Sequence, residues 1–390
     1  MGNKITIGNC CIGVCLVILT FFKNYLHDEL GGYIAVLILV STKAFTLIHG
    51  ARRGDFDSVL IFFQVLSVLK FYEYFLTKKS KKLYVAFIAI AFAVLTKSIV
   101  GFLILPGLIF ASVLFEKFHF VYKNKHLYFA LVSCLLVIAI YYLLRNYYNP
   151  GYLLAVYENE LGGRYLNALE GNKGYMLLYF HGLTARYLLW LFFVPLGVYV
   201  AHQKEGILKE FVSVLSLIVV IFFLIISSSK TKLLWYDLPI YPFLGMIFAT
   251  YFSQNKGDES TLGKMYVFSI VFMFNYAFIV KQVINNHSTI PRALGTFNVA
   301  TYLKNKINEG IEGKKINIIN QDEESVNVNR FYINKLKSLN NVVNYVSVGD
   351  LIDGDIVIVC KPVEEEQIIE RYEVRLIENY KGVKLYTIKQ

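Results

Sequence analysis

The chain has 390 residues, of which 56% are hydrophobic and 17% are charged, and its net charge is +11. A soluble chain is expected to be about 25% charged, so the composition excludes an assembly of ordinary water-soluble domains. The apolar residues, 56% of 390 or about 218, suffice for ten membrane spans, which need about 200 at roughly 20 residues each. The composition therefore predicts a polytopic helical membrane protein.

Apolar stretches of spanning length recur along the first three quarters of the chain and predict about ten spans. They fall at residues 5–22, 31–48, 57–76, 83–96, 99–116, 128–144, 184–202, 211–227, 234–252 and 265–284. The two stretches that flank Lys97 are also compatible with one re-entrant hairpin. The first stretch is expected to be a retained span, because no small-residue cleavage site follows Phe22.

The basic residues indicate an orientation. Residues 291–390 hold 14 basic and 14 acidic residues, which leaves 39 − 14 = 25 basic and 28 − 14 = 14 acidic residues in the preceding part. This asymmetry fits loops that face an anionic leaflet, and it argues against nucleic-acid binding. One set of alternating loops carries 12 lysines, whereas the opposite short loops carry five basic residues. The positive-inside rule then places the first set in the cytoplasm and both chain ends outside.

Two segments depart from the pattern of spans and short loops. Residues 145–182 form a long, tyrosine-rich external loop that suits a helix in the membrane interface. Residues 291–390 contain four short strand patterns (KKINIIN, NVVNYVSV, GDIVIVC and VKLYTI) with helical patterns at about 325–339 and 363–373. The predicted fold class is thus mainly α: a transmembrane domain of residues 1–285, followed by a small extracytoplasmic α/β domain of residues 291–390.

Metal and redox chemistry have little support in the sequence. Three of the five cysteines crowd the first apolar stretch, so no disulfide framework is expected. The seven histidines are scattered without ligand spacing, which makes a zinc site improbable. External carboxylates leave a divalent cation open, and no other cofactor is expected.

Charged residues gather at the external ends of the spans, where topology does not require them. Charges near the hydrocarbon need partners or a polar cavity. The four segments are ARRGDFDSVLIFF, AVLTKSIVGFLILPG, NPGYLLAVYENELGGRY and SSSKTKLLWYDLPIYPFLGM. Each has a plainer interpretation by itself: Arg53 as a headgroup flank, Lys97 as a snorkelling anchor, and Glu158 and Glu160 as solvated loop charges.

Taken together, the four segments resemble successive landmarks of the GT-C membrane glycosyltransferases, in particular the bacterial aminoarabinose transferases and the dolichyl-phosphate-mannose protein mannosyltransferases. Their order, spacing and sidedness agree over about residues 1–255. The resemblance implies a glycosyltransferase of the bacterial cytoplasmic (inner) membrane. Such an enzyme moves a sugar from a polyprenyl-phosphate donor to an extracytoplasmic acceptor, which is a lipid, a glycan or a protein.

This chemistry assigns expected roles to the clustered residues. A polyprenyl phosphate leaving group needs cations as negative charge develops on it, and an acceptor hydroxyl needs a carboxylate base. Asp55 and Asp57 are the candidate bases. The candidate substrate-binding residues are Arg53, Lys97, Glu158, Glu160, Arg164, Lys230, Lys232 and Tyr236.

One departure from the family leaves an alternative open. The family normally begins with a further span and an external acidic loop, whereas this sequence starts at what resembles the second span. Asp28 and Glu29 could substitute for the acidic loop only if every later loop were inverted, against the distribution of lysines. The alternative is therefore a non-catalytic or truncated relative that binds lipid-linked sugar or partners a complete transferase. A transporter is disfavoured, because no two-fold hydropathy repeat is evident.

Overall fold

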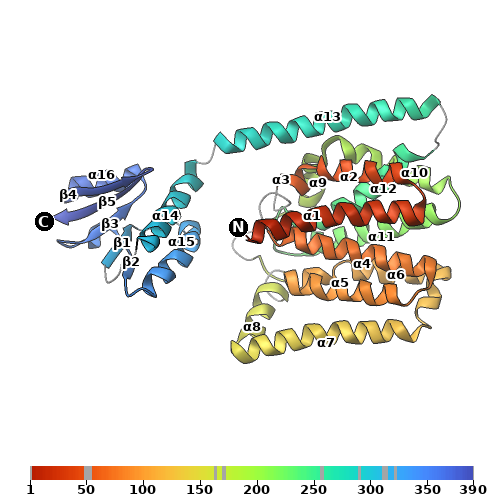
Figure 1. The fold of residues 1–390 in the computed structure, drawn as a ribbon, viewed down its shortest axis with the longest axis horizontal. Helices are drawn as coiled ribbons and strands as arrows, with labels where there is room; N and C mark the ends of the chain where they lie inside the picture. The colour runs from red at the N-terminus through yellow and green to blue at the C-terminus, as the bar shows by residue number, and fades with distance from the viewer. Residues whose placement is uncertain are drawn as a thin grey trace. The chain divides into compact units, whose positions relative to one another are not determined.

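The computed structural model describes residues 2–47, 55–161, 165–168, 173–254, 259–288, 291–309, 315–319 and 323–389. The chain forms two compact units, Met1–Val283 and Ile284–Gln390. The first unit is helical and the second contains a five-stranded sheet (Figure 1). The predicted fold class, a helical membrane protein with a small α/β domain, is confirmed.

The helices of the first unit follow one another with short connections. They are α1 (Gly2–Phe21), η1 (Phe22–Leu26), α2 (Glu29–Val40), α3 (Lys43–Leu47), α4 (Asp57–Thr77), α5 (Lys81–Lys97), η2 (Ser98–Phe102), α6 (Leu105–Leu114), η3 (Glu116–Val121), α7 (Lys125–Tyr148), α8 (Tyr152–Val156), η4 (Tyr157–Leu161), α9 (Leu178–Tyr187), η6 (Leu188–Phe192), α10 (Phe193–His202), α11 (Ile207–Ser228), η7 (Leu238–Ile240), α12 (Tyr241–Ser253) and α13 (Glu259–Ser288).

Within the described residues, five helices are long and apolar enough to cross a membrane, and the bent pair α9 and α10 brings the number to six if it is one span. Four shorter apolar helices, Cys10–Leu26, Glu29–Val40, Leu105–Leu114 and Leu238–Ser253, complete the set. Each of these segments overlaps one or two of the ten apolar stretches of the sequence. The chain is a multi-pass membrane protein.

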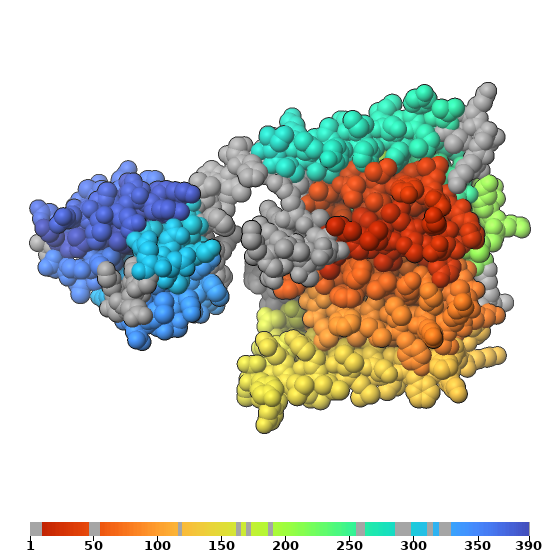
Figure 2. All heavy atoms as spheres, in the orientation of Figure 1, coloured from red at the N-terminus to blue at the C-terminus, as the bar shows by residue number. Residues whose placement is uncertain are grey.

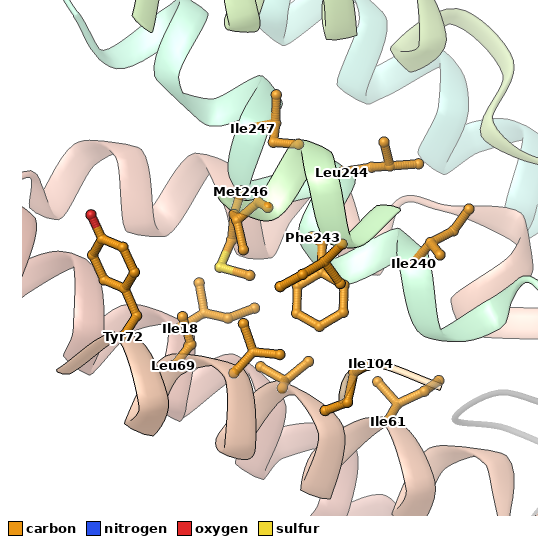
Figure 3. Close-up of a cluster of buried hydrophobic side chains, with 14 of the residues drawn as sticks. Ile18, Ile61, Leu69, Tyr72, Ile104, Ile240, Phe243, Leu244, Met246 and Ile247 are labelled. Atoms are coloured by element: carbon orange, nitrogen blue, oxygen red, sulfur yellow. The ribbon is translucent and has the colours of Figure 1, made fainter. Parts of the chain in front are cut away.

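The helices differ in how deeply they are buried. Almost every side chain of α12 is buried, and Phe243 and Met246 of α12 lie against Ile18 of α1 and Leu69 of α4 in the interior (Figure 3). In contrast, only 17% of the apolar window of α7 and 22% of that of α13 is buried inside the protein. These two helices lie on opposite sides of the unit (Figures 1 and 2), where their apolar side chains face lipid.

Helices α4 and α5 form an antiparallel hairpin that determines which side chains share an end of the unit. Lys78 ends α4 in the left-handed conformation, with φ of 55°, and α5 begins three residues later. Asp57 at the start of α4 and Lys97 at the end of α5 consequently lie at the same end of the hairpin. Glu73 lies 16 positions further along α4, roughly 24 Å away along the helix axis.

Glu73 marks the opposite end of the hairpin. Its buried carboxylate accepts hydrogen bonds from Lys70 at 2.6 Å, Lys82 at 2.5 Å and the Tyr25 hydroxyl at 3.2 Å. Asp28 follows η1, the segment that contains Tyr25, and caps α2 by accepting a hydrogen bond from the Gly31 amide at 3.1 Å. Asp28 therefore has a structural role at the end of the unit away from Asp57.

The second unit is a mixed sheet with the strand order β2-β1-β3-β5-β4. Strand β1 is parallel to β2 and β3, whereas β5 is antiparallel to both β3 and β4. Its elements are α14 (Pro291–Asn308), β1 (Lys315–Ile319), α15 (Glu323–Lys337), β2 (Val342–Val346), η8 (Val348–Asp350), β3 (Ile356–Val359), α16 (Pro362–Arg371), β4 (Glu373–Tyr380) and β5 (Val383–Lys389). Four of these strands are the four expected from the sequence, and β4 is an additional strand.

Candidate functional site

An apolar cavity of about 320 Å³ lies where segments from four distant parts of the first unit meet. One wall comes from η2 and the residue after it, a second from η4 and Tyr165, a third from the end of α11, and the last from Tyr236. The described residues that line it are Ile99, Val100, Leu103, Glu160, Tyr165, Ile225, Ile226, Ser229 and Tyr236. Glu160 is the one charged residue among them.

An ion pair between a buried carboxylate and a partly exposed lysine lies beside this cavity. The ammonium group of Lys97 is 2.5 Å from Oδ1 of Asp57 and 5.7 Å from the centre of the Tyr236 ring, which itself lines the cavity. Asp57 is in the first turn of α4 and Lys97 in the last turn of α5, so each charge also has the favourable sign for its helix terminus. Lys97 is therefore paired with a carboxylate and lies beside an aromatic ring of the cavity wall.

The backbone after Lys97 turns sharply to form the cavity wall. Ser98 has φ of 49°, a value that L residues rarely adopt. A Cβ on Gly101 would lie 2.3 Å from the backbone nitrogen of Val94, so only glycine permits this approach. From α4, the buried Gln64 donates a hydrogen bond to the Val100 carbonyl at 2.9 Å. These three features place Ile99 and Val100 at the cavity.

Lys232 is buried behind the end of α11. Its ammonium group donates hydrogen bonds to the carbonyls of Ser227 at 2.6 Å and Ser229 at 2.7 Å, and it lies 5.6 Å from the centre of the Tyr179 ring. Burial lowers the pKa of this lysine. Lys232 thus compensates the partial negative charge at the C-terminus of α11 and supports the turn that carries Ser229.

The chain after α11 is also bonded to the loop around Tyr165. The Lys230 amide donates to the Tyr165 carbonyl at 2.9 Å, and the Tyr165 hydroxyl is 2.9 Å from Oγ of Ser228. Thr231 adds a hydrogen bond to the Asn167 carbonyl at 2.8 Å. These contacts hold two segments more than 60 residues apart against the same cavity.

The residues expected from the sequence occupy different positions around the cavity. Glu160 and Tyr236 line it, and Asp57 and Lys97 form the adjoining pair. Asp55 precedes α4, and its carboxylate accepts a hydrogen bond from the Phe56 amide at 2.7 Å. Glu158 and Lys230 are exposed. Arg53 and Arg164 lie outside the described residues.

Three polar residues at or beside the cavity escaped the sequence analysis: Gln64, Tyr165 and Ser229. Gln64 had a detectable signal, since a glutamine within an apolar span needs a partner. No feature of the sequence singled out Tyr165 or Ser229, apart from their position in segments with clustered charges.

Within the described part of the chain, no three His, Cys, Asp or Glu side chains come together in a group that could hold a metal ion.

The fold is that of a solved membrane protein. The crystal structure of ArnT from Cupriavidus metallidurans bound to undecaprenyl phosphate superposes with a TM-score of 0.71 over 98% of this chain and 83% of that chain, at 12% identity. Its apo structure gives 0.68 at 11% identity, with the same coverage. In addition, residues 4–150 match the family model described as dolichyl-phosphate-mannose-protein mannosyltransferase. The resemblance to GT-C glycosyltransferases is confirmed.

A curated relative extends the similarity without adding a function. An uncharacterized protein of Aquifex aeolicus (strain VF5) is 28% identical over 243 residues, which cover 61% of this chain and 47% of that protein. The chain therefore aligns with about half the length of this relative. The matched family segment ends at residue 150 and so includes Asp57 and Lys97, whereas Glu160 and Tyr236 lie beyond it.

Proposed function

We propose that this GT-C-like protein transfers a sugar from a polyprenyl-phosphate donor to a hydroxyl-bearing acceptor. The observation that carries the proposal is the cavity itself, where a carboxylate, an adjoining ammonium group and apolar walls from distant segments meet. The undecaprenyl phosphate bound to the similarly folded ArnT supports a lipid phosphate as ligand.

The proposed reaction breaks one bond of the donor and forms one bond to the acceptor. The glycosidic bond between the sugar carbon and the phosphate oxygen breaks, and its electron pair leaves with the polyprenyl phosphate. The ammonium group of Lys97, held beside Tyr236, stabilises the charge that develops on this oxygen. Lys230, exposed near the cavity, and the sequence-predicted Arg53 and Arg164 are further cations for this role.

The acceptor needs a base, and Glu160 has the best position for it. Its side chain lines the cavity, whereas the Oδ1 atom of Asp57 accepts from Lys97. Glu160 would take the proton of the acceptor hydroxyl as the new bond to the sugar carbon forms. The Ile, Val and Leu side chains of the remaining walls suit the isoprenyl segment next to the phosphate.

The location of the site follows from the charge distribution. Twelve lysines in the alternate loops favour a cytoplasmic position for the end of the unit near Glu73. The cavity, the long loop of residues 145–182 and the sheet domain would then lie outside the cytoplasmic membrane. The acceptor would be a lipid, glycan or protein on that side.

The direct test is transfer by the purified full-length protein in nanodiscs, offered a panel of undecaprenyl-phosphate sugars with a membrane extract as acceptor source. Mass spectrometry of the undecaprenyl phosphate formed measures turnover. We expect Lys97→Gln to lower turnover at least 100-fold, while Lys209→Gln, at an exposed lysine at the start of α11, retains it. Binding of the donors without any turnover would instead favour a non-catalytic lipid-sugar binder.

A further inference from the structure

We propose that Asp57 is a positioning residue that competes with the polyprenyl phosphate product for the ammonium group of Lys97, and thereby promotes product release. This inference rests on the proposed function. In this role the ion pair neither removes a proton nor only stabilises the fold: it speeds the release of the product.

The ion pair is asymmetric in its exposure. The Asp57 side chain is 3% exposed and that of Lys97 is 25% exposed. The lysine is therefore partly accessible, and its ammonium group lies 5.7 Å from the centre of the ring of Tyr236, which lines the cavity, whereas the carboxylate is almost fully enclosed. An anion in the cavity can approach the ammonium group, but it cannot replace the carboxylate at its buried position.

Binding of a phosphate to Lys97 is consequently opposed by the weakening of the ion pair between Lys97 and Asp57. Drawing the ammonium group toward the cavity weakens its contact with Asp57, and a buried carboxylate that loses its counter-ion is strongly destabilised. Re-formation of the ion pair recovers this free energy when the phosphate leaves.

The cost matters most for the product. The donor is a phosphodiester with one negative charge, whereas the released polyprenyl phosphate is a monoester with about −1.5 to −2 charges at pH 7. Without competition, Lys97 would hold the more highly charged product more tightly than the donor. The neighbouring carboxylate offsets that preference.

The experiment measures binding of undecaprenyl phosphate to the full-length protein in nanodiscs. Asp57→Asn keeps the size of the side chain and removes its charge, so we expect the product to bind about tenfold more tightly, equivalent to about 1.4 kcal/mol. In turnover assays, kcat and the donor KM should both fall. Asp57→Glu, which keeps a carboxylate, should restore wild-type affinity.

Two further variants identify the cause. Glu205→Gln removes an exposed carboxylate in the connection between α10 and α11 and should leave the product affinity unchanged. In the Lys97→Gln background, Asp57→Asn should no longer tighten binding, because the competition needs the ammonium group. Weaker or unchanged product binding in Asp57→Asn, with wild-type protein that binds and turns over the donor, would overturn the inference. Wild-type protein that binds no polyprenyl phosphate would overturn the proposed function instead.

A measurement on the wild-type protein covers the case in which Asp57→Asn does not fold. Infrared difference spectra of protein labelled with [4-¹³C]aspartate should show a shift of a carboxylate stretching band when undecaprenyl phosphate is added, as the ion pair loosens. Unchanged carboxylate bands at saturating ligand would contradict the exchange of partners.

Discussion

Glu158 and Glu160 lie two positions apart in η4, yet the structure gives them different surroundings. Glu160 lines the cavity, whereas Glu158 is exposed. A base must reach the proton that it removes, so only Glu160 has a suitable position. The sequence presents both carboxylates equally, because alternation within a loop does not reveal which side faces a cavity.

The two glutamates provide a matched pair of variants. We expect Glu160→Gln to lower kcat for sugar transfer by about 100-fold or more, in the range typical of a lost general base, with little change in donor affinity. The fold decrease in kcat caused by Glu158→Gln should be at least ten times smaller than that caused by Glu160→Gln. Steady-state kinetics with a saturating donor measure the difference, and equal effects of the two variants would remove Glu160 from the role of base.

At the level of single residues, the sequence indicates which charges need an explanation but not how they combine. Lys97 is conspicuous as a lysine between two apolar stretches, and Asp57 begins the preceding span. Their pairing depends on the similar lengths of α4 and α5 and on the tight turn between them. Lys232 resembles Lys97 in the sequence, but its ammonium group contacts two backbone carbonyls at the end of α11, an arrangement that only the folded turn reveals.

The element that shapes the cavity is η2, and its position depends on one glycine. Because a Cβ on Gly101 would meet the backbone of Ala93 and Val94 at 2.5 and 2.3 Å, Gly101→Ala must displace η2 from α5. Overpacking of this kind costs about 1–3 kcal/mol. We expect a lower melting temperature in detergent and, since Ile99 and Lys97 flank the same turn, a loss of sugar transfer.

Gly263→Ala is the matched control for this substitution. Gly263 lies in α13, where an added Cβ would meet no atom within 4 Å beyond its chain neighbours and the nearby backbone of its own helix, and alanine is more stable than glycine in a helix interior by about 0.5–1 kcal/mol. The control should keep or slightly raise the melting temperature. A wild-type melting temperature and activity in Gly101→Ala would show that η2 tolerates the displacement.

In the sheet domain, the buried strands could be predicted from the sequence, whereas the edge strand β4 could not. The buried strands β1 and β3 contain consecutive Ile and Val residues, which makes them recognisable. Strand β4 was not expected, because it is an edge strand in which five of eight residues are exposed and three are charged, and its register is irregular between Leu376 and Glu378. Such an interruption removes the alternation on which strand prediction depends.

Ion pairs across this domain make a pH dependence predictable. Lys384 donates to both carboxylate oxygens of Glu365, at 2.6 and 2.8 Å, and Tyr386 donates at 2.5 Å. The Lys384 ammonium, followed by the Tyr386 hydroxyl, lowers the pKa of Glu365 below its ordinary value of 4.5. The folded state thus favours the carboxylate, which stabilises folding above pH 4.5 and ceases to do so as the pH falls through the lowered pKa.

Hydrogen–deuterium exchange of the full-length protein tests this pH dependence. After correction for intrinsic exchange rates, peptides of α16 and β5 should lose protection as the pH falls from 6 to below 4.5. In Glu365→Gln this loss should be smaller, because the neutral amide does not titrate. A pH dependence equal to that of the wild type would assign the effect to other groups.

At the scale of the whole molecule, the proposed reaction requires the cavity to face away from the cytoplasm. The lysine distribution predicts this orientation, and Lys173 and Glu205 allow it to be tested. Both are exposed. Lys173 forms a β-bridge with Thr231 beside the cavity, whereas Glu205 lies in the connection between α10 and α11, which the predicted topology assigns to the cytoplasm.

Single cysteines at these two positions, in a background without the five native cysteines, can be labelled with a membrane-impermeant maleimide. We expect Lys173→Cys to react in intact spheroplasts and Glu205→Cys to react only after permeabilisation. A third cysteine in place of the exposed Asp350 reports on the sheet domain and should react like Lys173→Cys. The reverse pattern would place the cavity in the cytoplasm, where an acceptor outside the membrane could not reach Glu160, and the proposed direction of sugar transfer would be wrong.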